Sequence, residues 1–171
     1  NLNISRYIST AQAEPEVDLA ATHARLREIQ DALEAATARH NRYLAELDAL
    51  FAADACSGRE RLMRYWQTWL DKQVDACAEQ KCMVVKLGGE VADLSDAMRV
   101  TLRDGTEQVV QRIARVIEAG VADGSIPPMD APAIAQTLYQ LWLGASLIGK
   151  LHRDGAALAN AMAFTRSLLA P

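Results

Sequence analysis

Residues 130–151 read DAPAIAQTLYQLWLGASLIGKL, a pattern that requires a helix covered on nearly every side. Asp130 is a good N-cap, and Pro132 suits the first turn, where its missing N–H costs nothing. From there to Leu151 apolar side chains occur all round the helix, so one layer of neighbours is too little cover. Its most apolar part is too short to cross a bilayer and carries Lys150, so we expect no membrane segment here. We expect a central helix, half of whose surface is covered by a second subunit.

Helical patterns extend over most of the remaining chain. Between Asp18 and Phe51 apolar side chains recur in steps of three and four, as in the seam of a coiled coil. The seam consists of Leu19, Thr22, Leu26, Ile29, Leu33, Ala36, His40, Tyr43, Leu47 and Leu50. Ser57 and Glu60 form a capping box, which starts a helix that runs to about Ala76.

Three more helices and an irregular arm complete the expected fold. A short helix is expected at about 84–92, another begins at a cap formed by Ser95 or Asp96, and a last one covers 156–169. No segment alternates between apolar and polar residues as a strand does, so the predicted fold class is all-α. The predicted division of the chain is an irregular arm (1–18), a long amphipathic helix (19–51) and a helical domain (52–171).

Composition and charge argue against several classes of function. The chain has 171 residues and a formal net charge of -4, without the clustered Lys and Arg that nucleic-acid binding needs. Its 3 cysteines lack the spacing of a disulfide framework and follow no signal peptide, so we expect reduced thiols in a cytoplasm. The 3 histidines show no metal-ligand spacing with them, and no phosphate loop, nucleophile elbow or catalytic triad is present. We therefore expect no enzyme, no cofactor and no metal site.

Three stretches carry a family resemblance: residues 82–99 (CMVVKLGGEVADLSDAMR), 139–153 (YQLWLGASLIGKLHR) and 43–51 (YLAELDALF). Together they resemble the C-terminal effector-binding and dimerisation domain of TetR-type repressors. Within that family they are most similar to the branch that represses N-ethylmaleimide reductase and senses electrophiles through a cysteine. The resemblance extends over about 43–169. It implies a helical bundle that binds a small hydrophobic or electrophilic effector and forms a homodimer.

The dimer that this resemblance implies is built from the last two predicted helices, over 132–153 and 156–169. Two helices from each subunit then form a four-helix interface.

The first part of the chain, residues 1–43, resembles a different family. It begins NLNISRY, continues through an acidic stretch and leads into a charged amphipathic helix. In this it is similar to the C-terminal tail of the modification (methyltransferase) subunit of type I restriction-modification systems. That resemblance implies that the helix over 19–43 packs against a specificity subunit, although the catalytic motifs of the methyltransferase are absent from this sequence. Because a TetR-type repressor has its helix-turn-helix at this place, we expect a chimeric chain with no direct DNA binding of its own.

Cys82 is the leading candidate for chemistry. It lies near Lys81 and Lys86, and nearby cations lower the pKa of a thiol and favour its reactive thiolate form. From the residues alone, a free cysteine equally suits the role of a small buried hydrophobe, and Lys150 suits a helix end, where a cation complements the dipole. The resemblance implies a specific pair: Cys82 falls on the position of the redox-sensing cysteine, and Lys150 on that of a lysine that traps the oxidised sulfur in a sulfur–nitrogen link. A sulfenic acid is electrophilic, so this chemistry is consistent.

The other two cysteines are weaker candidates. The related branch often has a second cysteine eight positions before the sensing one, where this chain has Val74. Cys77 lies closer to Cys82 and is a possible resolving thiol if the loop bends back; otherwise it has no role, as we expect for Cys56.

Four aromatic residues are candidates to line an effector pocket: Tyr65, Trp66, Trp69 and Tyr139. Large apolar pockets between helices suit small hydrophobic ligands that a few polar groups orient. The same rings also suit the filling of a core without any pocket. The sequence leaves both interpretations open.

Three interpretations of the whole chain remain. The first is the ligand- and redox-sensing regulatory domain of a TetR-type regulator, with Cys82 as its sensor. The second is an interaction module whose helix 19–43 docks on a restriction specificity subunit, and the third is a rearranged gene product without selected activity. Homodimerisation and a reactive Cys82 favour the first, and capture of a different protein through 19–43 favours the second.

Overall fold

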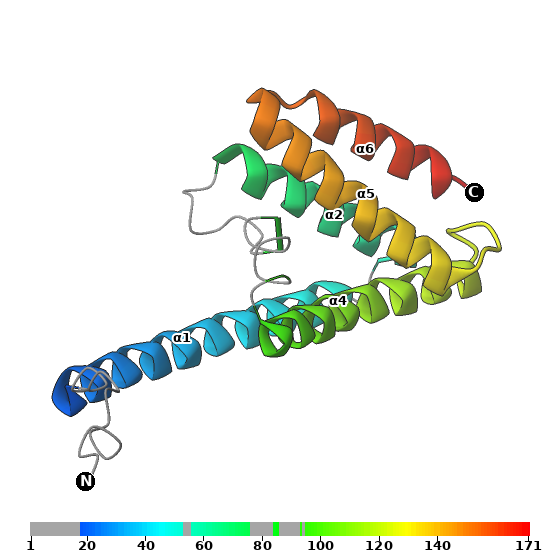
Figure 1. Ribbon diagram of the computed structural model, residues 1–171. Coiled ribbons are helices and arrows are strands. Elements are labelled where there is room, and N and C mark those ends of the chain that lie inside the picture. Colours follow the sequence, from blue (N-terminus) through cyan, green and yellow to red (C-terminus); the bar gives the residue numbers. More distant parts are fainter. Residues whose placement is uncertain (1–17, 53–55, 76–83, 86–92, 94) are drawn as a thin grey trace, which may run out of the picture. The chain divides into compact units, whose positions relative to one another are not determined.

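The computed structural model describes residues 18–52, 56–75, 84–85, 93 and 95–171 (Figure 1). Its helices are α1 (Leu19–Phe51), α2 (Gly58–Asp75), α4 (Asp96–Ala122), α5 (Ala131–His152) and α6 (Ala156–Leu168). Within these ranges no residue is in a strand, and the all-α prediction is confirmed. The arm expected over 1–18 lies outside the described residues except for Asp18, and so does most of the short helix expected at 84–92.

The helix starts follow the capping residues that the sequence indicates. Asp18 and Asp130 each accept hydrogen bonds from backbone N–H groups two or three residues further on, at 2.9 to 3.1 Å. Ser57 and Glu60 bond each other reciprocally: the Ser57 N–H donates to the Glu60 carboxylate at 2.9 Å, and the Glu60 N–H donates to the Ser57 hydroxyl at 3.3 Å. Of the two caps proposed for α4, Ser95 is the one that accepts a backbone N–H, at 3.4 Å. Each bond satisfies a helical donor that has no partner within its own helix.

The chain divides into two compact units, residues 1–42 and 43–171. In the first unit two apolar residues of the α1 seam are exposed: Leu26 is 58% and Ile29 60% accessible. In the second unit the seam is buried, with Leu47 only 3% accessible. Among the described residues of α1, only those in its last turns are therefore buried in a core.

The core of residues 43–171 is formed by the end of α1 together with the four later helices. α5 packs against both α4 and α6, and α2 packs against the same two helices (Figure 1). The largest fully buried side chains are Trp66, Trp142, Leu62, Ile113, Ile117, Ile126, Leu138, Leu169 and Thr165. Each large apolar side chain removed from water contributes about 1.5–3 kcal/mol, so this layer is the main source of stability. No helix among the described residues is both long enough and apolar enough to cross a membrane.

The start of α2 is held by the loop that follows α4. The Gly58 N–H donates to the Asp123 carboxylate at 2.7 Å, and the next N–H, of Arg59, donates to the Ser125 hydroxyl at 3.1 Å. A Cβ at Gly58 would lie 2.3 Å from the backbone nitrogen of Gly120. A glycine is therefore required where α2 meets α4, because any side chain would push the two backbones apart.

Candidate functional site

Two helices bring the four predicted aromatic residues into one buried cluster. α2 supplies Tyr65, Trp66 and Trp69, and α5 supplies Tyr139; all four are at most 8% accessible. The ring centroids of Tyr65 and Trp66 lie 4.6 Å apart, and those of Trp69 and Tyr139 lie 6.0 Å apart at right angles. These are favourable geometries for aromatic pairs. The structure thus places the four rings in the core, and whether they also line a ligand pocket stays a prediction.

Three residues of this cluster were not among the sequence candidates. Trp142 of α5 stacks on Trp66, with ring centroids 4.8 Å apart and an interplanar angle of 13°. Ser146 and Thr165 are buried and supply the hydroxyl groups that the indoles contact. A signal for the α5 pair was present, since Trp142 and Ser146 follow Tyr139 by three and seven residues and so share its helix face.

Two of the three indole N–H groups have protein acceptors. Trp69 Nε1 donates to Ser146 Oγ at 3.0 Å, and Ser146 Oγ donates in turn to the Trp142 carbonyl at 2.7 Å. Trp142 Nε1 donates to Thr165 Oγ1 at 3.1 Å, and Thr165 Oγ1 donates to the Ala161 carbonyl at 2.7 Å. In both cases one hydroxyl accepts a hydrogen bond from the indole N–H and donates its own hydrogen bond to a carbonyl one helical turn earlier.

The third indole lacks such an arrangement. Trp66 is 0% accessible, and its Nε1 has no hydrogen-bond acceptor among the described residues. A buried donor left unpaired costs about 1–3 kcal/mol, and such groups in native proteins call for an explanation.

The predicted sensor pair is only partly within the described residues. Cys82 and the possible resolving thiol Cys77 lie outside them. Lys150 lies near the end of α5 and is exposed. Cys56 is a half-buried free thiol just before α2. In the part of the chain that the structure describes, no group of His, Cys, Asp and Glu side chains is arranged to hold a metal ion.

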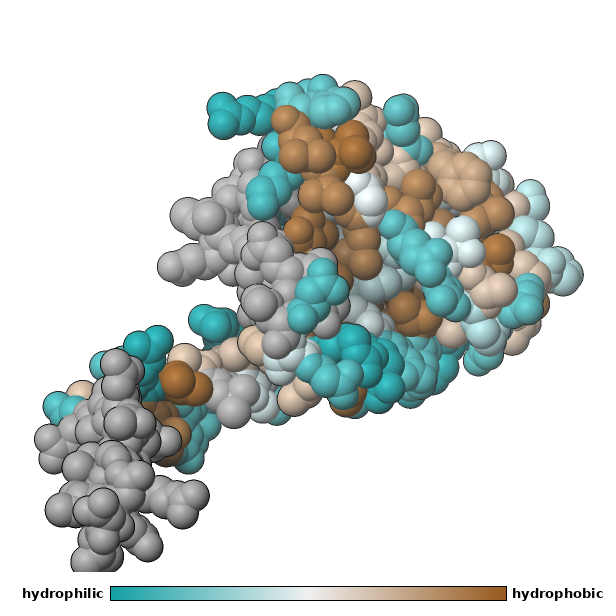
Figure 2. Space-filling view, viewed as in Figure 1, coloured by the Kyte–Doolittle hydropathy of each residue, from teal (hydrophilic) through white to brown (hydrophobic). Residues whose placement is uncertain are grey.

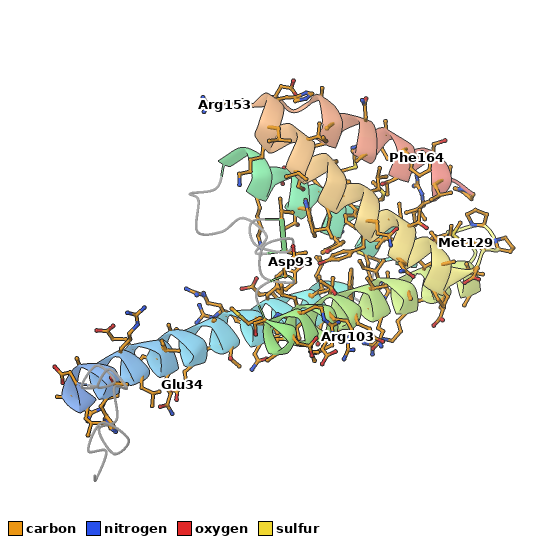
Figure 3. The ribbon with its side chains drawn as sticks, viewed as in Figure 1. Glu34, Asp93, Arg103, Met129, Arg153 and Phe164 are labelled. Carbon is orange, nitrogen blue, oxygen red and sulfur yellow. The ribbon has the colours of Figure 1, made fainter. Side chains whose placement is uncertain are left out.

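The last two helices also present large apolar side chains to the outside. On α5, Leu147 is 44%, Ile148 41% and Leu151 67% accessible. On α6, Phe164 is 51% accessible (Figure 3). Hydrophobic residues gather over the upper part of the view in Figure 2, where α5 and α6 lie. α5 therefore has apolar side chains on its buried and on its exposed side, as its sequence predicts.

Comparison with known proteins places these features in a family context. A model of the tetracycline repressor-like C-terminal domain matches residues 58–165. The curated relatives are the HTH-type transcriptional repressors NemR of Escherichia coli K12 and of E. coli O6:H1, each 32% identical over 129 residues. The match covers 75% of this chain and 65% of either repressor, so the chain spans just under two thirds of their length.

The fold is similar to those of solved structures, among them the following two. One is the reduced form of E. coli NemR, with a TM-score of 0.71 and 31% identity, covering 77% of this chain and 69% of that one. The other is a transcriptional regulator of the TetR/AcrR family, with a TM-score of 0.68 and 33% identity, covering 78% and 69%.

Proposed function

The chain belongs to the family of tetracycline repressor-like C-terminal domains, and we propose on this basis that it is the effector-sensing and dimerisation domain of a transcriptional regulator. In such a domain, a ligand or an oxidant shifts the population between two arrangements of a dimer. Within this proposal Cys82 is the sensor of electrophiles or oxidants, and Lys150 is its partner.

The exposed apolar side of α5 is the observation that carries the proposal. Leu151 follows Leu147 by four residues and Ile148 by three, so the three side chains lie along a single face of the helix. Gly144 lies one turn earlier, and a Cβ built on it would meet nothing within 4 Å. Phe164 adds an exposed ring on α6. Exposed apolar side chains on two helices that pack against each other suit packing against a second copy of the chain.

The dimer is tested by the mass of the protein in solution. At micromolar concentration, light scattering after size exclusion is expected to give twice the chain mass. The double substitution Leu151→Glu and Phe164→Glu is expected to give a monomer, because it would bury charges without partners. Met98 of α4 is equally exposed, at 53%, so Met98→Glu is a matched control that should remain a dimer. A monomeric wild-type protein would remove the basis for the proposal.

The sensor chemistry rests on the sequence of the Cys82 segment and on the exposure of Lys150. A two-electron oxidant such as hydrogen peroxide converts a thiolate to a sulfenic acid. The Lys150 amine then attacks the sulfur, an S–N bond forms, and the hydroxyl leaves as water with a proton from the amine. The product contains two hydrogens fewer than the reduced protein.

Intact-mass spectrometry distinguishes this product from other oxidised forms. In a variant with Cys56→Ser and Cys77→Ser, no intramolecular disulfide can form, so a loss of two hydrogens after peroxide treatment reports a bond between the Cys82 sulfur and a nitrogen. Adding Lys150→Arg is expected to abolish that loss, whereas Lys72→Arg, at another exposed lysine, should preserve it. In the wild type, Cys82 should alkylate faster than Cys56 and Cys77. Equal labelling of the three thiols would leave the sensor without a mechanism.

A second candidate function rests on the first unit of the chain. The exposed Leu26 and Ile29 of α1 leave an apolar stripe without cover in that unit, and the resemblance of residues 1–43 suggests a restriction specificity subunit as its partner. Co-purification with such a subunit, lost on substitution Leu26→Glu with Ile29→Glu, is the expected result. A failure to co-purify would leave the regulatory function as the one that the chain supports.

A further inference from the structure

The three buried tryptophans of the domain differ in how their indole N–H groups are satisfied. Trp69 and Trp142 each have a hydroxyl acceptor, supplied by Ser146 and Thr165. Trp66 is as deeply buried as Trp142, yet its N–H has no acceptor. Because an unpaired buried donor costs stability, the Trp66 N–H is a position for an acceptor that the described residues do not supply.

The surroundings of Trp66 define what is able to satisfy its N–H. Its ring contacts Tyr65, Trp69 and Trp142, at centroid distances of 4.6, 5.9 and 4.8 Å. All three of these neighbours are aromatic rings, and none carries a carboxylate, ammonium or guanidinium group. An anionic acceptor would lose its hydration and gain one neutral donor, which is unfavourable in such a place. An uncharged ligand with a flat apolar body would keep contact with the rings and offer its oxygen to the indole.

We infer, on the premise of the proposed effector-sensing function, that Trp66 Nε1 is the polar anchor for an uncharged aromatic effector with a carbonyl-type acceptor oxygen. The indole N–H donates to that oxygen, and the effector packs among the rings of α2 and α5. Because Trp66 is fully buried, the ligand reaches it only when a neighbouring side chain or segment moves aside. Binding is thereby linked to a rearrangement of the cluster, which is the property that an effector-sensing domain needs.

Two small probes of nearly equal shape test the anchor. Acetophenone has a carbonyl oxygen, and ethylbenzene does not; neither is a thiol-reactive electrophile, so the chemistry of Cys82 is not involved. The wild-type protein is expected to bind acetophenone about tenfold more tightly than ethylbenzene, as measured by calorimetry or by ligand-detected NMR. Trp66→Phe should bring the ratio of the two affinities to about one, whereas Trp69→Phe should leave the preference for acetophenone in place.

The ratio of the two affinities is compared, rather than each affinity alone, because Trp66→Phe replaces a large ring by a smaller one. The space that this leaves is open to both probes equally, so it does not change the ratio. Replacement of Trp66 by 3-benzothienylalanine, which has sulfur in place of the N–H, keeps the ring size and should give the same loss of preference. In ¹⁵N-indole spectra of the wild type, the Trp66 resonance should shift most on addition of acetophenone.

Each outcome has a definite meaning. Equal affinities for the two probes in the wild type, or an unchanged preference in both Trp66 variants, would overturn the assignment of Trp66 and leave the effector-sensing function intact. If neither probe binds at millimolar concentration, the assignment fails as well. Loss of the dimer and of Cys82 reactivity, in the separate experiments above, is what would overturn the proposed function itself.

Discussion

Thr165 and Ser146 give two buried indole N–H groups their acceptors, so single hydroxyl groups should matter for stability here. Thr165→Val keeps the shape of the side chain and removes the acceptor of Trp142. We expect it to lower the free energy of unfolding by about 1–3 kcal/mol, because a buried donor is left unpaired. Urea unfolding followed by tryptophan fluorescence measures the change.

Thr137→Val is the matched control for that substitution. Thr137 also donates to a carbonyl one turn earlier, at 2.8 Å, but it is exposed on α5. We expect a change within about 0.5 kcal/mol at this site. If the two substitutions lower the free energy of unfolding equally, the hydrogen bond between Thr165 and Trp142 does not contribute to stability beyond that of an exposed threonine.

Asp123 makes the start of α2 sensitive to acid. Hydrogen bonds from the Ser125 hydroxyl and from the Gly58 N–H hold the pKa of the Asp123 carboxyl below its usual value. A carboxyl group with a lowered pKa stabilises the folded state above the unfolded-state pKa of about 3.9, and this contribution is lost as the pH falls through the folded-state pKa. Asp123→Asn should therefore lower the urea midpoint at pH 7, and its difference from the wild type should shrink below about pH 4. A difference that is the same at pH 7 and pH 3 would contradict this role of the charge.

At the level of helices, the contact between α2 and α4 depends on one glycine. A Cβ at Gly58 would lie 2.3 and 2.4 Å from backbone atoms of Gly120, and backbone cannot move aside as a flexible side chain can. Gly58→Ala should therefore cost at least about 2 kcal/mol of unfolding free energy. Gly144→Ala on α5 is the control, because its Cβ meets nothing and alanine favours a helix by about 1 kcal/mol. Both variants are best measured by urea unfolding in the background of Leu151→Glu with Phe164→Glu, the pair of substitutions expected to give a monomer. A Gly58→Ala protein as stable as its parent would contradict the tight contact.

The contacts of the helices show which parts of the fold could be predicted from the sequence and which could not. The caps at Ser57, Ser95 and Asp130 were predictable, because each bonds a backbone group at most three residues away. The bond from Gly58 to Asp123 joins residues 65 apart, and no local pattern signals it. In the same way, spacing along α2 and α5 pointed to the aromatic residues, but only the packing of the helices showed that Trp66 stacks on Trp142.

Over the whole molecule, the boundary between the two compact units coincides with the position at which we expect, from the sequence, the family resemblance to change. From the sequence we expect this change at about residue 43, and the boundary between the two compact units lies between Arg42 and Tyr43. The steps of three and four continue through this point, which allowed the prediction of one unbroken helix from Leu19 to Phe51. The sequence pattern did not show which turns of that helix join a core, because the same spacing occurs on both sides of the boundary.

The buried core itself leads to the last prediction. All of its residues lie at or after position 43, the first being Tyr43 and Leu44. A chain that begins at Arg39 keeps one extra turn before them, so the end of α1 does not fray where it is needed. Compared at equal concentration, this shortened chain should unfold cooperatively and lose less than about 1 kcal/mol of unfolding free energy. Loss of the cooperative transition would mean that residues 1–38 contribute to the core of the second unit, and the chain would then be one folding unit rather than a sensory domain with an appended helix.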